Sequence, residues 1–205
     1  MVAWCAAARL EARGLLARLI IVNIPHPAAF FANLGLAQAV RSLYIVFFHL
    51  PWAPEWLLSR DDGRALEQMF LGRHMGVRRR AGATALARAD VDVFKAALAQ
   101  PGALTAALGW YRQIFAATHD DFAALAPSAA RPLKAPVLIL WGTADAALGE
   151  ELLRGTDAFC ADLTVRRLEG CSHWAQQDFV EECVAEAARF CGVAPRLLGV
   201  APPVQ

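Results

Sequence analysis

Three short apolar runs along the chain have the character of buried β-strands. The first is ARLIIVNIPHP (residues 17–27), which is rich in β-branched residues and stops at two prolines. The second is APVLILWG (135–142), and the third is the more polar DLTVRRLEG (162–170). Continuous apolar runs bounded by Pro and Gly are typical of strands covered on both faces of a parallel sheet. The polar character of the third run predicts a place nearer the sheet edge.

Helical patterns follow the second and third of these strands. AALGEELLRGTDAFC (146–160) follows the second, and AQQDFVEECVAEAARFC (175–191) follows the third with apolar residues spaced by three and four. That spacing predicts an amphipathic helix packed on one face. Strands and helices in alternation predict an α/β fold with a parallel sheet.

Residues 28–131 interrupt this alternation with a series of helical pieces. Pro51, Pro54, Pro101 and the turn at 61–63 divide them. We expect this segment to form a lid over the carboxyl ends of the strands, where ligand sites lie in open α/β sheets. Residues 1–27 and 132–192 would then form a partial core of about three strands, and 193–205 a loose C-terminal tail.

Two residues that could carry chemistry follow the second and third strands. Asp145 comes after LILWGTA, and His173 comes after VRRLEGCS. An acid after one strand and a histidine after the next is the order in which an α/β-hydrolase presents two members of its triad, in which the carboxylate fixes the imidazole tautomer and the imidazole activates a nucleophile or water. Taken alone, an aspartate in a turn that opens a helix, such as Asp145, is usually an N-cap. The occurrence of both at neighbouring strand ends favours the catalytic interpretation.

The two tyrosines of the chain, Tyr44 and Tyr111, both fall on predicted lid helices. A phenol donates a hydrogen bond to an oxygen that gains negative charge, so the pair could stabilise such an oxygen. The alternative is that both pack on amphipathic helices with the hydroxyl at water.

Composition and charge exclude several classes of function. The net charge of +1 gives no reason to expect a nucleic acid or an acidic membrane as partner, and the basic run Arg78 to Arg80 is interpreted as a solvated face. No apolar stretch reaches the roughly 18 residues of a membrane helix. The five cysteines lack C-x-x-C or zinc-type spacing, which predicts reduced, mostly buried thiols in a cytoplasmic protein without metal or cofactor.

Four stretches carry a resemblance to a known family: SLYIVFFHLPWAPEWLL, GWYRQIF, LWGTADAALG and GCSHWAQQD. They resemble the epoxide hydrolase branch of the α/β-hydrolase superfamily, over about Met1 to Phe190. The resemblance implies that Tyr44 and Tyr111 donate hydrogen bonds to an epoxide oxygen. It also implies that an aspartate nucleophile forms an ester with a small apolar epoxide, and that a water activated by His173 and its orienting acid Asp145 hydrolyses that ester.

The chain departs from this family at its start. Family members carry the nucleophile in a motif like HDWGG just before a helix that resembles VAWCAAARL, and an HGxP-type oxyanion loop earlier still. Neither motif is present here, and there is no G-x-S-x-G. We therefore expect a truncated, inactive chain, or a longer gene product in which Met1 is internal. The strand at 18–23 would then be an exposed apolar edge prone to self-association.

Two alternatives stay open. Haloalkane and haloacetate dehalogenases share the aspartate, acid and histidine but hold halide with ring N–H donors, which the six tryptophans could supply. A non-catalytic fragment would act, if at all, by binding a partner through its open sheet edge.

Overall fold

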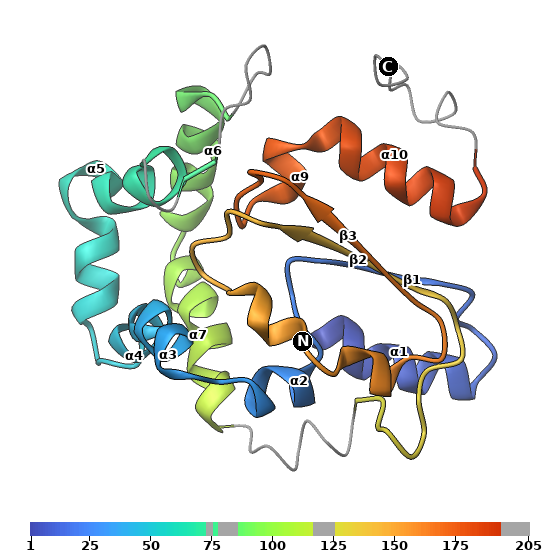
Figure 1. Cartoon of the computed structure of the whole chain (residues 1–205). Coiled ribbons are helices and arrows are strands. Elements are labelled where there is room, and N and C mark those ends of the chain that lie inside the picture. The colour runs from blue at the N-terminus through green and yellow to red at the C-terminus, as the bar shows by residue number, and fades with distance from the viewer. Residues whose placement is uncertain (73–75, 78–85, 117–125, 194–205) are drawn as a thin grey trace.

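The core of the fold is a parallel three-stranded sheet. A computed structural model describes residues 1–72, 76–77, 86–116 and 126–193. The strands β1 (Leu19–Val22), β2 (Val137–Gly142) and β3 (Leu163–Leu168) pair in the order β1-β2-β3, as Figure 1 shows. The predicted α/β fold with three parallel strands and flanking helices is therefore confirmed.

The central strand β2 is apolar and buried along its whole length because helices cover both faces of the sheet. Alternate side chains of a strand point to opposite faces. Val137, Ile139 and Trp141 pack in one apolar cluster with α1 (Val2–Ala12). Leu138 and Leu140 pack in another with α9 (Ala175–Asp178) and α10 (Val180–Cys191). In Figure 1, α1 lies below the sheet and α9 and α10 lie above it.

The outer strands differ from β2 in ways that the sequence anticipates. β3 exposes Arg166 and Arg167 and, among the strands of the described residues, pairs only with β2, as expected of an edge strand. β1 pairs with β2, and no other strand in the described part of the chain bonds to its second side. Helix α1 begins at Val2 without a side-chain cap.

Between β1 and β2 the chain forms a helical region, defined here as α2 to α7. Its helices are α2 (Pro27–Ala32), α3 (Leu36–Arg41), α4 (Leu43–Phe48), α5 (Ala53–Leu71), α6 (Arg88–Leu98) and α7 (Ala103–Ala116). It has a small core of its own around Leu58, Leu66 and Leu108. In Figure 1 the arrows of β2 and β3 point toward this region.

The breaks within the helical region only partly follow the sequence pattern. The expected turn at 61–63 is present as a kink in α5, where Asp61, Asp62 and Gly63 all have positive φ. The run from Ala28 to Phe48 reads as a single helical piece, but it is divided around Gly35, the N-cap of α3, and again at Ser42.

The stretch that follows β2 also differs from the expected helix. It forms two single turns of 3₁₀-helix, η1 (Glu150–Leu153) and η2 (Thr156–Phe159), and not a continuous α-helix. Gly155 lies between them at φ 75°, a left-handed conformation that ends a helix and favours glycine.

Two further expectations concern the basic run and the C-terminal tail. The basic run Arg78 to Arg80 and the tail beyond Val193 lie outside the described residues.

All five cysteines are free, and Cys160, Cys171 and Cys183 are buried. Among the described helices, none combines the length and apolarity that a membrane crossing requires.

Candidate active site

Asp145 lies three residues beyond β2, in a loop that folds around its carboxylate. The side chain is only 1% exposed. Its Oδ1 accepts hydrogen bonds from the backbone N–H groups of Ala147 and Leu148, at 2.8 and 2.9 Å. One carboxylate oxygen thus behaves as the capping interpretation expects, and these two bonds fix the direction of the other oxygen.

That second oxygen faces His173, in the loop after β3. Nδ1 of His173 lies 2.7 Å from Oδ2 of Asp145. Because an ionised carboxylate can only accept, the imidazole donates through Nδ1–H, and Nε2 carries the free lone pair. The His173 side chain is 31% exposed. The structure therefore brings the two predicted residues together in direct hydrogen-bond contact.

The His173 loop lies tightly against the end of β2. At Gly142, the last residue of β2, an added Cβ would come within 2.5 Å of the carbonyl oxygens of Cys171 and Ser172, so only glycine allows this approach. The N–H of Ser172 donates to Oδ2 of the buried Asp178 at 2.6 Å. Sequence reasoning missed Asp178, although a carboxylate so close after the histidine motif was a usable signal.

Tyr44 on α4 and Tyr111 on α7 lie side by side in the helical region. Their ring centroids are 5.9 Å apart, with the rings nearly perpendicular. Burial raises the pKa of both phenols, and the pKa of Tyr44 is raised further by its neighbours Tyr111 and Asp145. Both hydroxyls therefore remain protonated donors. Tyr44 lies close enough to Asp145 for the charge of that carboxylate to raise the pKa of the phenol.

Arg112 links the helices that carry these phenols through hydrogen bonds. Its guanidinium binds both carboxylate oxygens of Glu55, at 2.8 and 3.1 Å, and Nε donates to the carbonyl of Phe48 at 2.9 Å. Nε2 of His49 also lies 3.2 Å from the carbonyl of Arg112. A bidentate pair of this kind constrains both partners, so α4, α5 and α7 are held together next to the tyrosines.

Gln38 on α3 connects the helical region to the Asp145 loop. Its Nε2 donates to the carbonyl of Ala147 at 2.8 Å and to Oγ of Ser42 at 3.0 Å, while Oε1 accepts from the N–H of Gly149 at 2.9 Å. The residue is completely buried. Sequence reasoning missed Gln38, because a lone amide in a helix gives no sign of its partner.

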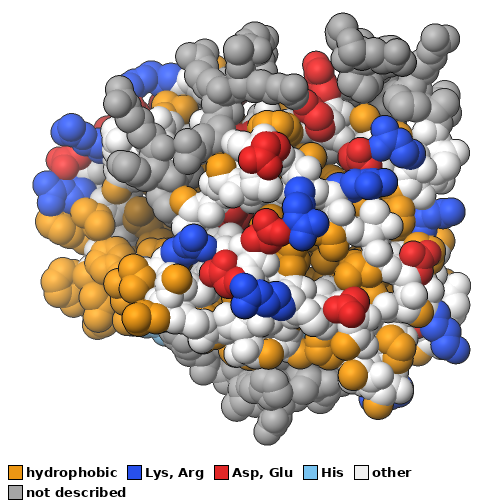
Figure 2. Space-filling view, in the orientation of Figure 1, with side chains coloured by type: hydrophobic (Ala, Val, Ile, Leu, Met, Phe, Trp, Pro, Cys, Tyr) orange, Lys and Arg blue, Asp and Glu red, His pale blue; other side chains and the backbone are white. Residues whose placement is uncertain are grey.

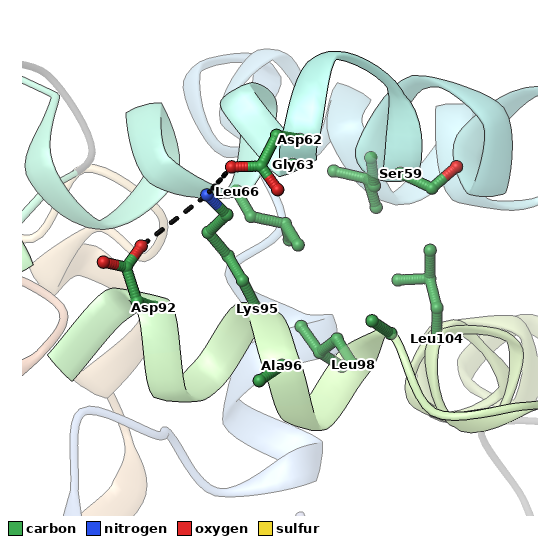
Figure 3. A pocket seen from close by; sticks show the side chains of 11 residues that line it. Ser59, Asp62, Gly63, Leu66, Asp92, Lys95, Ala96, Leu98 and Leu104 are labelled. Atoms are coloured by element: carbon green, nitrogen blue, oxygen red, sulfur yellow. Dashed lines mark hydrogen bonds and ion pairs between the residues drawn. The ribbon is translucent and has the colours of Figure 1, made fainter. Parts of the chain in front are cut away.

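A cavity of about 470 Å³ lies elsewhere in the helical region, between α5, α6 and α7 (Figure 3). Leucines line one part of it, and Lys95 forms ion pairs with Asp62 at 2.8 Å and Asp92 at 3.6 Å. None of the four predicted site residues lines this cavity. It is therefore a feature separate from the Asp145 and His173 pair.

The thiols nearest the site do not offer a ready nucleophile. Burial raises the pKa of Cys171 far above its usual value and that of Cys183 to about 11, so both stay protonated near neutral pH. Within the described ranges, no group of three or more His, Cys, Asp or Glu side chains could hold a metal ion.

Comparison with known proteins begins with sequence relatives. No protein-family model matches the chain. Epoxide hydrolase 2 of Caenorhabditis elegans is 36% identical over 166 residues, which cover 80% of this chain and 44% of the relative. Epoxide hydrolase 4 of Homo sapiens is 31% identical over 183 residues, which cover 87% of this chain and 47% of the relative. The chain thus spans about half the length of the curated relatives it matches.

Solved structures give the same result for the fold. A mutant of an epoxide hydrolase from Bacillus megaterium aligns with a TM-score of 0.73 at 23% identity, covering 92% of this chain and 64% of that one. A structure from a study of novel epoxide hydrolases in hot-environment metagenomes aligns with a TM-score of 0.68 at 27% identity, covering 93% and 63%. Together with the sequence relatives, these likenesses show that the chain belongs to the epoxide hydrolase-like α/β-hydrolases.

Proposed function

We propose that this chain supplies the base, its orienting acid and the oxygen-binding phenols of an epoxide hydrolase, which converts a small apolar epoxide to a diol. The observation that carries the proposal is the 2.7 Å approach of His173 Nδ1 to Asp145 Oδ2. The nearby pair of protonated phenols, Tyr44 and Tyr111, supports an epoxide as the substrate. The printed names of the relatives point to the same reaction.

The first step of the proposed reaction opens the epoxide. An aspartate carboxylate, which none of the residues assigned here provides, attacks a ring carbon and breaks its bond to oxygen. The electron pair of that bond moves to the oxygen, which becomes an alkoxide. Tyr44 and Tyr111 donate hydrogen bonds to this oxygen and deliver the proton that makes it a hydroxyl. Their raised pKa values suit this role, because only a protonated phenol can donate.

The second step hydrolyses the ester that results. Nε2 of His173 takes a proton from a water as the water oxygen attacks the ester carbonyl. Asp145 stabilises the imidazolium that forms, through the hydrogen bond at Nδ1. Collapse of the tetrahedral intermediate breaks the bond to the diol oxygen, which takes the proton of the imidazolium, and leaves a carboxylic acid. That acid returns its proton to the tyrosine phenolate left by the first step, so the carboxylate and the phenol are both regenerated.

We also propose that residues 28–131 act as the lid of this site, on a core formed by 1–27 and 132–192. Two contacts support this division: Gln38 bonds to the Asp145 loop, and Phe70 of α5 lies 4.9 Å, ring to ring, from Trp174 beside His173. A lid in contact with both catalytic loops would exclude bulk water and hold the tyrosines over the reacting atoms.

The experiment uses the longest open reading frame that contains this chain, with styrene oxide as probe. We expect diol formation, and we expect His173→Ala to lower its rate by about 10³-fold, the scale of a lost general base. The His173→Ala protein should also accumulate the ester, visible as a substrate-mass adduct in intact mass spectrometry. Unchanged turnover in His173→Ala would overturn the proposal.

The polypeptide of these 205 residues alone should form no diol, since the covalent step needs a nucleophile. Diol formation by this polypeptide that is abolished in His173→Ala would contradict this expectation. An in-frame HDWGG-like segment in the coding DNA upstream of Met1 would support a longer product, and a stop codon directly upstream would count against it.

Dehalogenation is the second candidate, and one observation favours it. Trp174 lies next to His173, with 5.6 Å between their ring centroids, and an indole N–H can hold a halide. Halide release from 1-bromobutane, measured beside diol formation on the same reading frame, separates the two reactions. Halide release without diol formation would replace the epoxide assignment.

Partner binding through β1 is the non-catalytic candidate, because β1 pairs on one side only within the described residues. Light scattering across a range of concentrations tests self-association through residues 18–23. A monomer at all concentrations with a cooperative melt would count against it.

A further inference from the structure

Asn23 occupies an unusual position directly after β1. Its backbone has a left-handed conformation at φ 47°, which asparagine tolerates better than most residues with a Cβ. Its N–H continues the sheet by donating to the carbonyl of Leu140 at 2.9 Å. The residue is only 1% exposed, so its side-chain amide has no access to bulk water.

The side chain of Asn23 finds all its partners at the ends of the other two strands. Nδ2 donates to the carbonyl oxygens of Ser172 and His173, both at 2.9 Å. Oδ1 accepts from the N–H of Gly142 at 2.7 Å. One buried carboxamide therefore joins the end of β1, the end of β2 and the loop after β3, and both of its N–H groups are used.

One of these partners is the backbone carbonyl of His173 itself. We propose that Asn23 is a positioning residue that sets the His173 imidazole against Asp145. The inference deepens the proposed function and rests on it, since it assigns a role toward the base of that same site. Asn23 does not touch the reacting atoms and acts through the backbone of His173.

The geometry explains why an amide is needed at this position. The His173 loop presents two carbonyl oxygens to Asn23, and Gly142 presents an N–H, so the partner must donate twice and accept once. Asparagine matches this pattern, whereas aspartate could accept from Gly142 but would place a negative charge against two carbonyl oxygens. The loop would then move away from β2 and lengthen the bond between His173 and Asp145.

The test uses NMR on the 205-residue chain labelled with ¹⁵N. It follows the His173 Nδ1 proton, which a 2.7 Å hydrogen bond to a carboxylate shifts downfield and protects from exchange. Asn23→Asp should abolish this resonance. Asn23→Gly keeps the left-handed backbone free of strain and removes only the side chain, and its proton should exchange about tenfold faster, the effect of losing a buried hydrogen bond.

Asn33 provides a matched control. Its Nδ2 also donates to two backbone carbonyls, those of Ala29 at 2.8 Å and Arg154 at 2.9 Å, and so also joins distant segments. Asn33→Asp should leave the His173 resonance and its exchange rate unchanged, even if it lowers the melting temperature as much as Asn23→Gly does.

The outcomes separate positioning from a general role in stability. An unchanged exchange rate of the His173 Nδ1 proton in folded Asn23→Gly would overturn the proposal. An equal change in the resonance or exchange rate of this proton in Asn33→Asp would overturn it as well. Because the measurement needs no turnover, failure of the epoxide assignment would leave the NMR result intact, and failure of the positioning role would leave the activity tests intact.

Discussion

The sheet core and the helical region are stabilised in different ways. In the core, all six residues of β2 are buried and helices cover both faces. The helical region has a small core, and several of its large apolar side chains are exposed, such as Leu36 at 83% and Trp52 at 73%. Figure 2 shows apolar side chains gathered at the left, over the part of the molecule that holds α3 to α5.

This difference matters for the proposed site, because that site takes one half of its residues from each region. Asp145 and His173 follow strands of the well-packed core, so close packing limits how far they can move. Tyr44 and Tyr111 lie on helices whose placement depends on specific polar bonds, chiefly those of Arg112 and Gln38. We therefore expect apolar substitutions to have their largest effects in the core, and polar ones to matter most for the helical region.

The largest expected effect comes from the centre of β2. Ile139 is fully buried, so Ile139→Ala should lower the free energy of unfolding by about 4 kcal/mol through lost burial and a new cavity. Leu36→Ala in the exposed part of the helical region should change it by less than about 0.5 kcal/mol. Urea denaturation followed by circular dichroism measures both, and similar values would contradict the comparison.

The pH dependence of the free energy of unfolding tests the burial of His26, at the junction between β1 and the helical region. His26 is fully buried, stacks on Phe159 with 4.1 Å between ring centroids, and accepts a hydrogen bond from the N–H of Ala28 through Nδ1. Burial lowers the pKa of His26 to about 4, below its usual 6.5. The unfolded chain therefore binds a proton more readily, and stability falls as pH drops from about 6.5 toward 4.

The full loss from His26 is about 3 kcal/mol, reached near pH 4. Urea denaturation at several pH values measures it against His26→Asn, which keeps a capping side chain but does not titrate. The difference in stability between the two proteins should shift by this amount across the pH window. A constant difference would show that His26 is not buried as a neutral imidazole.

A smaller effect is expected where the helical region meets the Asp145 loop. Gln38→Leu should lower the free energy of unfolding by about 2 kcal/mol, because it leaves the carbonyl of Ala147 and the N–H of Gly149 without their partner. Hydrogen exchange at the Gly149 amide should accelerate in the same variant. Gln100→Leu removes an exposed amide that bonds only within its helix turn, and it should leave Gly149 unchanged.

The smallest effect is expected at the ion pair beside the tyrosines. Arg112 holds the pKa of the Glu55 carboxyl below its usual value, and both side chains are about a quarter exposed. Arg112→Lys loses the bidentate geometry and should lower the free energy of unfolding by about 1 kcal/mol. Arg189→Lys, at the more exposed pair with Glu186, should have no measurable effect in the same denaturation assay. Equal effects at the two pairs would contradict a special role for Arg112.

Much of the fold follows from local sequence signals, and the wrongly predicted helix boundaries have a common cause. The strands were predicted because apolar runs bounded by Pro and Gly are local patterns. The continuous helix expected after β2 was wrong because Gly155 takes a left-handed conformation that the pattern of apolar residues does not encode. The breaks at Gly35 and Ser42 were also missed, since the packing of α2, α3 and α4 decides them.

The same division holds for the site. Asp145 and His173 could be named from the sequence because each lies in the loop that follows a strand, and the ends of neighbouring parallel strands lie together. The amides of Asn23 and Gln38 could not, because their partners at Ser172, His173 and Gly149 are more than a hundred residues away along the chain.

The sequence by itself determined the α/β class, the place of the more polar third strand at the sheet edge, and the two residues that form the acid and histidine pair. Only the tertiary structure decided which buried amides hold the loops of Asp145 and His173 and how Tyr44 and Tyr111 meet. The physical reason is that apolar periodicity acts within one segment, whereas a buried polar group must find a partner wherever the fold places one.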